Sequence, residues 1–324
     1  MEIAGIEELR ALAADAASAR GFSPLSARQY LLFDVGGVDD ARVGAWLRGL
    51  ACPTISLGGG ALARTADVAL ERTEDPAALL ATIARAPIAA AVLVQLLRAT
   101  KRMPLESALV AESLAYSTLQ AGPEFRAWLA AHPLRASTDA KTADDSAVLM
   151  TRDGALLRLK LNRPDNRNAM SVEMRDALME ALQLALADDS IEKVEISARG
   201  KCFSVGGDLS EFGSAPDPAT AHIVRSLALP GRLLAALGAR ARVHVHGACI
   251  GSGAEFPAFA AHISANTDAW FQLPELEFGL IPGAGDTVSI ARRIGRQRTA
   301  WMALSGKRIN AQRALDWKLV DALA

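Results

Sequence analysis

The spacing of hydrophobic positions divides the chain into two unlike parts. Up to residue 132 the apolar positions recur mostly at helical spacing, and Pro87 interrupts the longest run. Two shorter apolar runs end at glycine clusters and predict strands at 29–35 and 53–57. The predicted helices cover residues 6–20, 40–50, 75–97, 105–120 and 124–131. We therefore expect residues 1–135 to form a mostly helical region with a small α/β piece.

A polar stretch separates this region from the rest of the chain. Residues 136–146 are small or charged and have no apolar period, which is typical of a linker. Beyond it, short strands alternate with helices, and Ser171 has the position of a helix cap. The predicted elements are a hairpin at 148–151 and 155–161, a helix from 171 to 188, strands at 193–198 and 242–245, and a helix at 221–237. This alternation predicts that residues 147–324 form an α/β core with a mostly parallel sheet.

Two glutamates lie in a glycine-rich stretch between residues 244 and 285. Glu255 follows a strand end and a tight glycine turn, so we expect it in the first turn of a helix. Glu275 follows Pro274 and precedes a Pro-Gly-rich segment, which predicts an ordered loop without regular structure. Glycine loops before helices also present backbone N–H groups that can stabilise negative charge on an acyl oxygen. The stretch therefore predicts a site for acyl chemistry.

Composition and charge narrow the range of partners. The chain has 324 residues, a formal net charge of -1 and no long Lys/Arg cluster, so nucleic acid is not an expected partner. Its first residues lack the basic start and apolar core of a signal peptide, and the apolar run at 86–97 is too short to span a bilayer. We expect a cytoplasmic protein with no membrane partner. The 3 cysteines are odd in number and widely spaced, which argues against a disulfide framework and a zinc knuckle.

Five short motifs occur in an order that resembles one known family. They are Leu161-Asn162-Arg163-Pro164 with Asn168-Ala169-Met170, Cys202 to Leu209, Gly247 to Glu255, Pro274-Glu275, and Ile281-Pro282-Gly283-Ala284-Gly285. In this order, across residues 148–323, they resemble the crotonase superfamily, and enoyl-CoA hydratases in particular. The resemblance implies a crotonase-like (ClpP/crotonase) spiral of ββα units for this part of the chain.

The resemblance also implies a reaction and a set of site residues. The reaction is syn addition of water to a 2-enoyl-CoA thioester, with coenzyme A as part of the substrate and no further cofactor or metal. The implied roles are acid/base catalysis by Glu255 and Glu275, backbone oxyanion donors at Gly207 and Ser252, water positioning at Gly283, and CoA binding at Asn166, Arg167, Asn168 and Val205. Family members assemble as trimers or dimers of trimers, so a homo-oligomer is expected.

Several alternatives remain open at this stage. The same pocket serves double-bond isomerisation, thioester hydrolysis and cofactor-independent dioxygenation, and a non-catalytic acyl-CoA-binding subunit is a further hypothesis. Glu275 could instead cap a helix or pair with an arginine, and Glu255 could be merely solvated. His244 and His246, with Cys249 close behind, could be metal ligands, but no fourth ligand accompanies them and we expect structural roles.

The chain departs from the family pattern in three respects. Ser252 and Asp286 stand where the family commonly has glycine, and the serine is expected to narrow the pocket or to demand an unusual backbone angle. Family members continue with several helices after the segment that matches 307–320, whereas here residues 76–132 resemble that helical segment. We therefore expect the N-terminal helices to serve as a permuted lid over the acyl pocket.

Overall fold

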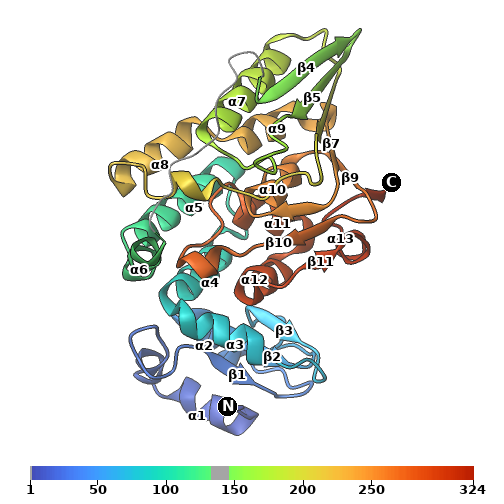
Figure 1. Cartoon of the computed structure of the whole chain (residues 1–324). Helices are drawn as coiled ribbons and strands as arrows, with labels where there is room; N and C mark the ends of the chain where they lie inside the picture. Colours follow the sequence, from blue (N-terminus) through green and yellow to red (C-terminus); the bar gives the residue numbers. More distant parts are fainter. Residues whose placement is uncertain (1, 133–145) are drawn as a thin grey trace.

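The computed structural model describes residues 2–132 and 146–324. Of the predicted linker, 136–146, only Ser146 therefore lies within the described residues. In Figure 1 the first strands and helices form one end of the molecule, and the elements from β4 onward form the other. Helix α4 lies between the two ends.

The first sheet consists of three short parallel strands in the order β1-β2-β3. They are β1 (Leu31–Phe33), β2 (Thr54–Leu57) and β3 (Val68–Leu70). Helices α1 (Ile6–Ala14) and α2 (Ala41–Gly49) pack together and share a small core with Phe33. This confirms the predicted α/β piece, although β3 was not predicted because a three-residue run is too short to show a period. The helix expected at 6–20 ends at Ala14, and a separate 3₁₀ turn, η1 (Ser18–Gly21), follows.

Four helices follow this sheet and pack against the second part of the chain. They are α3 (Ala77–Arg85), α4 (Pro87–Thr100), α5 (Leu105–Gln120) and α6 (Pro123–Ala131). Pro87 separates α3 from α4 as expected, and the two helices meet at a bend of 105°. Both α4 and α5 pack on α11 (Asp286–Ile294), and α5 also packs on α8 (Pro218–Leu227). Leu93 of α4 belongs to the same continuous core as Phe271 and Met302, so these helices complete that core.

A six-stranded sheet forms the scaffold of the second part, in the order β12-β9-β7-β6-β5-β4. Its strands are β4 (Val148–Asp153), β5 (Leu156–Leu161), β6 (Lys193–Ala198), β7 (Ala241–Val245), β9 (His262–Ala265) and β12 (Ala322–Leu323). The pair β4–β5 is antiparallel and the other neighbouring pairs are parallel, which confirms the predicted mostly parallel sheet. Leu157 and Leu159 are buried on the side of helices α7 (Val172–Ala187) and α9 (Pro230–Leu237), whereas Arg158 and Lys160 lie on the open face.

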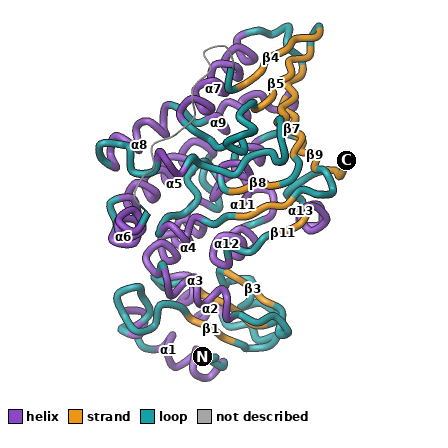
Figure 2. Tube along the Cα trace, viewed as in Figure 1, coloured by secondary structure: helices purple, strands orange, loops and turns teal. Residues whose placement is uncertain are grey.

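A second small sheet was not anticipated from the sequence. Its order is β11-β10-β8, formed by β8 (Ala248–Ile250), β10 (Trp270–Gln272) and β11 (Ile309–Asn310). These strands have two or three residues each, and Figure 2 shows them as short segments within long loops. Their pairing nevertheless determines the position of the site, because it brings the chain segments that carry Glu255 and Glu275 to one edge of this small sheet.

Two further features complete the fold. The single helix predicted at 221–237 is wrong, because Pro230 cannot continue a helix and instead begins α9. Further elements are α12 (Arg296–Ser305), α13 (Ala311–Trp317), and the 3₁₀ turns η2 (Leu209–Glu211), η3 (Gly238–Arg240) and η4 (Pro257–Phe259). Among the described helices, none alone has the length and apolar composition needed to cross a membrane, and α3 with α4 reaches them only as a bent pair.

Candidate active site

Two parallel strands bring the glutamates of the glycine-rich stretch together. Strands β8 and β10 are neighbours, with Ile250 paired to Gln272 at their ends. After β8 the chain turns at Gly251, which has a φ of 49°, and enters the one-turn helix α10 (Ser252–Glu255). Glu255 is 2% exposed. Because Glu275 lies three residues beyond the end of β10, both carboxylates reach the same edge of the sheet.

Glu275 begins a 3₁₀ turn, η5 (Glu275–Phe278), so the expectation of an irregular loop is wrong. Pro274 precedes this turn, and Gly279, with a φ of 70°, ends it. Proline before a first turn and glycine after a last turn are both favourable for a helix. Pro274 and Gly279 therefore exclude a long helix at this place but favour a short one between them.

The two carboxylates face one point in space. Glu275 Oε1 lies 2.5 Å, and Glu255 Oε1 3.9 Å, from the position that a β-carbon on Gly251 would occupy. A side chain at this position would collide with Glu275, and the positive φ of Gly251 also favours glycine. The other oxygen of Glu255, Oε2, accepts hydrogen bonds from the N–H groups of Ala284 at 2.6 Å and Asp286 at 3.2 Å.

Burial keeps protons on these acids at neutral pH. Burial, together with the charges of Glu275, Asp286 and Glu112, raises the pKa of Glu255 well above its usual value. Burial raises the pKa of Glu275 to about 8, and it also raises the pKa of Asp286 well above its usual value. The site can therefore hold a proton donor near neutral pH, and of these three acids Glu275, with a pKa of about 8, ionises nearest to that pH.

Unpaired polar atoms concentrate at this place. Among the described residues, five buried side-chain nitrogen or oxygen atoms have no hydrogen-bond partner. Four of the five belong to this site: Ser252 Oγ, Glu275 Oε2 and both carboxylate oxygens of Asp286. Buried polar atoms in folded proteins are normally paired, so such a cluster indicates a place built for a ligand or for water.

The two expected oxyanion donors lie on adjacent loops. Ser204 and Cys249 form an isolated bridge between these loops, and a β-carbon on Gly206 would lie 2.7 Å from the carbonyl oxygen of Ile250. Within the described chain, the N–H groups of Gly207 and Ser252 donate to no acceptor. Ser252 does not have a positive φ, so the expected unusual backbone angle is wrong, and the preceding Gly251 takes the turn instead.

The predicted CoA loop separates into exposed and buried positions. Arg167 is exposed, and its carbonyl oxygen accepts the N–H of Val205, which is half-buried. The Asn166 side chain donates to Asp208. Asn168 is fully buried, and its amide bonds Arg163, Arg199 and Cys202. The Asn168 side chain therefore shapes the loop and cannot also reach a nucleotide.

Helix α5 of the N-terminal region reaches into the same site. Glu112 is 2% exposed, and its carboxylate accepts hydrogen bonds from the Gly285 N–H at 2.7 Å and the Thr287 N–H at 2.9 Å. These donors lie at the start of α11, so Glu112 caps that helix from another part of the chain. The sequence did not single out this role, because a cap 173 residues distant from its helix has no local signal. The N-terminal helices therefore contact the site, whereas their role as a permuted lid over the acyl pocket stays a prediction.

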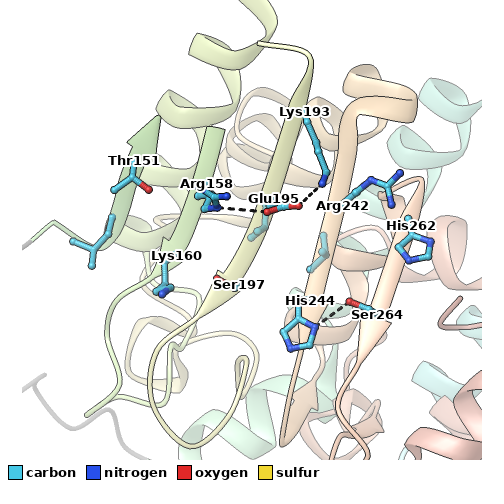
Figure 3. Close-up of a pocket in the computed structure, with 13 residues that line it drawn as sticks. Thr151, Arg158, Lys160, Lys193, Glu195, Ser197, Arg242, His244, His262 and Ser264 are labelled. Carbon is cyan, nitrogen blue, oxygen red and sulfur yellow. Dashed lines mark hydrogen bonds and ion pairs between the residues drawn. The ribbon is translucent and has the colours of Figure 1, made fainter. Parts of the chain in front are cut away.

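The other sequence candidates, His244 and His246, make hydrogen bonds within the fold. His244 Nδ1 lies 2.9 Å from Ser264 Oγ, and His246 Nε2 lies 3.0 Å from the Gly200 carbonyl oxygen. The described residues contain no group of three or more His, Cys, Asp or Glu side chains able to hold a metal. A hollow of about 480 Å³ lies on the open face of the large sheet, and Figure 3 shows its lining side chains, among them Arg158, Lys193 and Glu195. This hollow does not include the glutamate site.

Comparisons with known proteins indicate one family. Residues 151–324 match the family model described as enoyl-CoA hydratase/isomerase. The chain is 34% identical over 179 residues to 2,3-dehydroadipyl-CoA hydratase of Escherichia coli, which covers 54% of this chain and 68% of that protein. It is 30% identical over 181 residues to trans-2-decenoyl-[acyl-carrier-protein] isomerase of Streptococcus mutans, which covers 55% and 69%.

A solved structure gives the same result. Enoyl-CoA hydratase from Mycobacterium smegmatis superposes with a TM-score of 0.50 at 28% sequence identity, over 56% of this chain and 70% of that one. The predicted crotonase-like fold is confirmed for this part of the chain, with a further N-terminal region that is mostly helical. Because the family model spans more than half of the sequence, this chain belongs to the enoyl-CoA hydratase/isomerase family of the crotonase superfamily.

Proposed function

We propose that the protein is an enoyl-CoA hydratase, which adds water in syn fashion across the double bond of a 2-enoyl-CoA thioester. The observation that carries this proposal is the convergence of Glu255 and Glu275 on one point, with a buried unpaired oxygen on Glu275. The ionised carboxylate takes a proton from water as the water oxygen bonds to the β-carbon. The protonated carboxyl gives its proton to the α-carbon. The number of protons on the enzyme is then unchanged.

Backbone donors support the same reaction. Addition of water at the β-carbon places negative charge on the thioester oxygen until the α-carbon is protonated, and the N–H groups of Gly207 and Ser252 are the donors proposed to stabilise this charge. Within the described chain, neither N–H group donates a hydrogen bond to an acceptor, and Ser252 also begins a helix. Each such donor contributes roughly a 100- to 1,000-fold rate acceleration.

Coenzyme A is proposed as the carrier of the acyl group, with no separate cofactor. Arg167 is exposed and makes no ion pair with a described residue, so its guanidinium is free to meet a phosphate. Asn166 and Val205 flank it, and Asn168 holds the loop in place. Arg167→Ala should raise KM without changing kcat, the pattern of lost uniform binding.

Double-bond isomerisation is the second candidate reaction. It moves a proton between two carbons of the acyl chain and can use the same pair of acids, and one of the similar proteins is an isomerase. The deciding test is to offer 2-enoyl-CoA and 3-enoyl-CoA thioesters of several chain lengths separately. Hydration consumes the conjugated thioester absorbance and gives a product heavier by one water. Formation of that absorbance from 3-enoyl-CoA, without any hydration of 2-enoyl-CoA, would overturn the hydratase proposal.

A homo-oligomer, as a trimer or a dimer of trimers, is also proposed. Three large apolar side chains on the adjoining helices α5 and α8 are exposed, namely Leu114 at 51%, Ile223 at 54% and Leu227 at 74%. An apolar patch of this kind is typical of an interface. Light scattering that gives the mass of one chain at micromolar concentration would contradict this assembly.

A further inference from the structure

Helix α5 brings a tyrosine ring onto the glycine expected to position water. The nearest ring atoms of Tyr116 lie 2.3 and 2.5 Å from the position that a β-carbon on Gly283 would occupy, so the ring covers this glycine directly. The guanidinium carbon of Arg225, on α8, lies 4.6 Å from the ring centroid. These two contacts hold the ring between α8 and the loop before α11.

The hydroxyl of Tyr116 is not used by the fold. It makes no hydrogen bond with any described residue, and the Tyr116 side chain is half-buried. Glu275 and Glu255 lie near enough for their charges to act on the phenol. Burial, together with these charges, raises the pKa of Tyr116 above its usual value, so the group stays a neutral phenol at physiological pH and can both donate and accept a hydrogen bond.

The backbone N–H of Gly283, beside this ring, is a hydrogen-bond donor without a partner in the described chain. By contrast, the N–H groups of Ala284 and Asp286 are both taken by Glu255. A water bound to the Gly283 N–H would therefore lie next to the Tyr116 ring and close to the glutamate pair. Water in such a place needs two to four polar partners, and these groups can supply them.

We propose that Tyr116 is a further catalytic residue, whose hydroxyl oxygen accepts a hydrogen bond from the reacting water that Gly283 and the ionised glutamate hold. This proposal rests on the proposed hydratase function. One proton of the water passes to the ionised glutamate, the water oxygen bonds to the β-carbon, and the protonated glutamate gives its proton to the α-carbon. Tyr116 orients the water and keeps its own proton, so the balance of the reaction is unchanged.

The test is Tyr116→Phe, with Tyr30→Phe as the matched control. The chain has 2 tyrosines, and Tyr30 lies just before β1 in the first sheet. Phenylalanine keeps the ring against Gly283 and Arg225, so the melting temperature should stay at the wild-type value. We expect kcat for hydration to fall about 10- to 100-fold, which is the loss of one hydrogen bond to a reacting group. KM for the 2-enoyl-CoA and Kd for the saturated acyl-CoA should not change.

Two outcomes would overturn the proposal without touching the hydratase function. A kcat within twofold of wild type in Tyr116→Phe would show that the ring serves packing only. A rise in KM and Kd at constant kcat would show that Tyr116 binds the acyl group instead of the water. A wild-type protein that hydrates no 2-enoyl-CoA would overturn the hydratase function, and the role of Tyr116 with it.

Discussion

Two groups of buried acids in this molecule have opposite surroundings. Asp67 is fully buried at the junction between the first sheet and the α4–α12 helix pair. Its carboxylate accepts hydrogen bonds from Thr54 and from the guanidinium groups of Arg98 and Arg296. Asp286 in the glutamate site is buried as deeply, yet neither of its oxygens has a partner.

The difference separates structural acids from reactive ones. A buried carboxylate with two guanidinium partners is compensated, and removing it leaves buried positive charge behind. A buried carboxyl group without partners lowers the stability of the empty protein, and such groups gather where a ligand or a reaction uses them. Burial alone therefore identifies neither class, whereas burial without a partner identifies the site.

The largest expected effect on stability comes from Asp67. Asp67→Asn should lower the free energy of unfolding by about 3–5 kcal/mol, because Arg98 and Arg296 stay buried without a counter-charge. Urea unfolding measures this change. The control is Asp34→Asn, since the Asp34–Arg72 ion pair is largely exposed and should be worth less than about 1 kcal/mol. Equal losses in the two variants would remove the contrast between buried paired acids and exposed ones.

A smaller effect of opposite sign is expected at Asp286. Asp286→Ala should raise the free energy of unfolding by about 1–3 kcal/mol, because it removes a buried carboxyl group that has no hydrogen bond. Asp217→Ala is the matched control, since Asp217 accepts the Thr220 N–H at the start of α8 and its loss should destabilise the protein. Destabilisation by Asp286→Ala in the same urea experiment would mean that this side chain has a structural partner after all.

The pH dependence of stability gives the third test. Burial raises the pKa of Glu112 to about 7 and that of Glu275 to about 8 in the native state. Below pH 4.5 both residues are protonated in the native and the unfolded chain, so their contribution is greatest there. Above that pH the unfolded chain ionises first, and stability should fall as the pH rises from 5 through about 8. Chemical unfolding across this range measures the slope, and Glu112→Gln should reduce it. A stability that increases over this range would contradict the assignment.

Much of the fold follows from local patterns in the sequence. Helix α5 begins and ends where its apolar spacing, the preceding Pro104 and the following Gly122-Pro123 predict. Strand β6 likewise occupies the predicted residues, and Ser171 caps α7 through the N–H of Met174. Local signals fail for β8, β10 and β11, because strands of two or three residues exist only through their pairing.

The site was predicted only in part from the sequence, because some of its residues are placed there by long-range contacts. Glu255 and Glu275 belong to motifs that can be read along the chain, and the structure brings them together. Glu112 and Tyr116 lie on an ordinary-looking amphipathic helix, and the contacts that place them in the site are with residues more than about 100 positions away. The role of Asp67 is equally hard to predict from the sequence, since its partner Arg296 is 229 residues from it. Long-range partners of this kind become visible only in the folded chain.

The most direct test of the central claim is the turnover of a 2-enoyl-CoA by Glu275→Gln, measured with its stability. General acid/base catalysis contributes about 100- to 10,000-fold, so kcat should fall by that factor. Kd for the saturated acyl-CoA should stay unchanged, and the free energy of unfolding should not decrease, because Glu275 Oε2 has no partner to lose. Wild-type turnover in this variant, or a loss of stability like that expected for Asp67→Asn, would contradict the claim that the unpaired acids mark the reactive site.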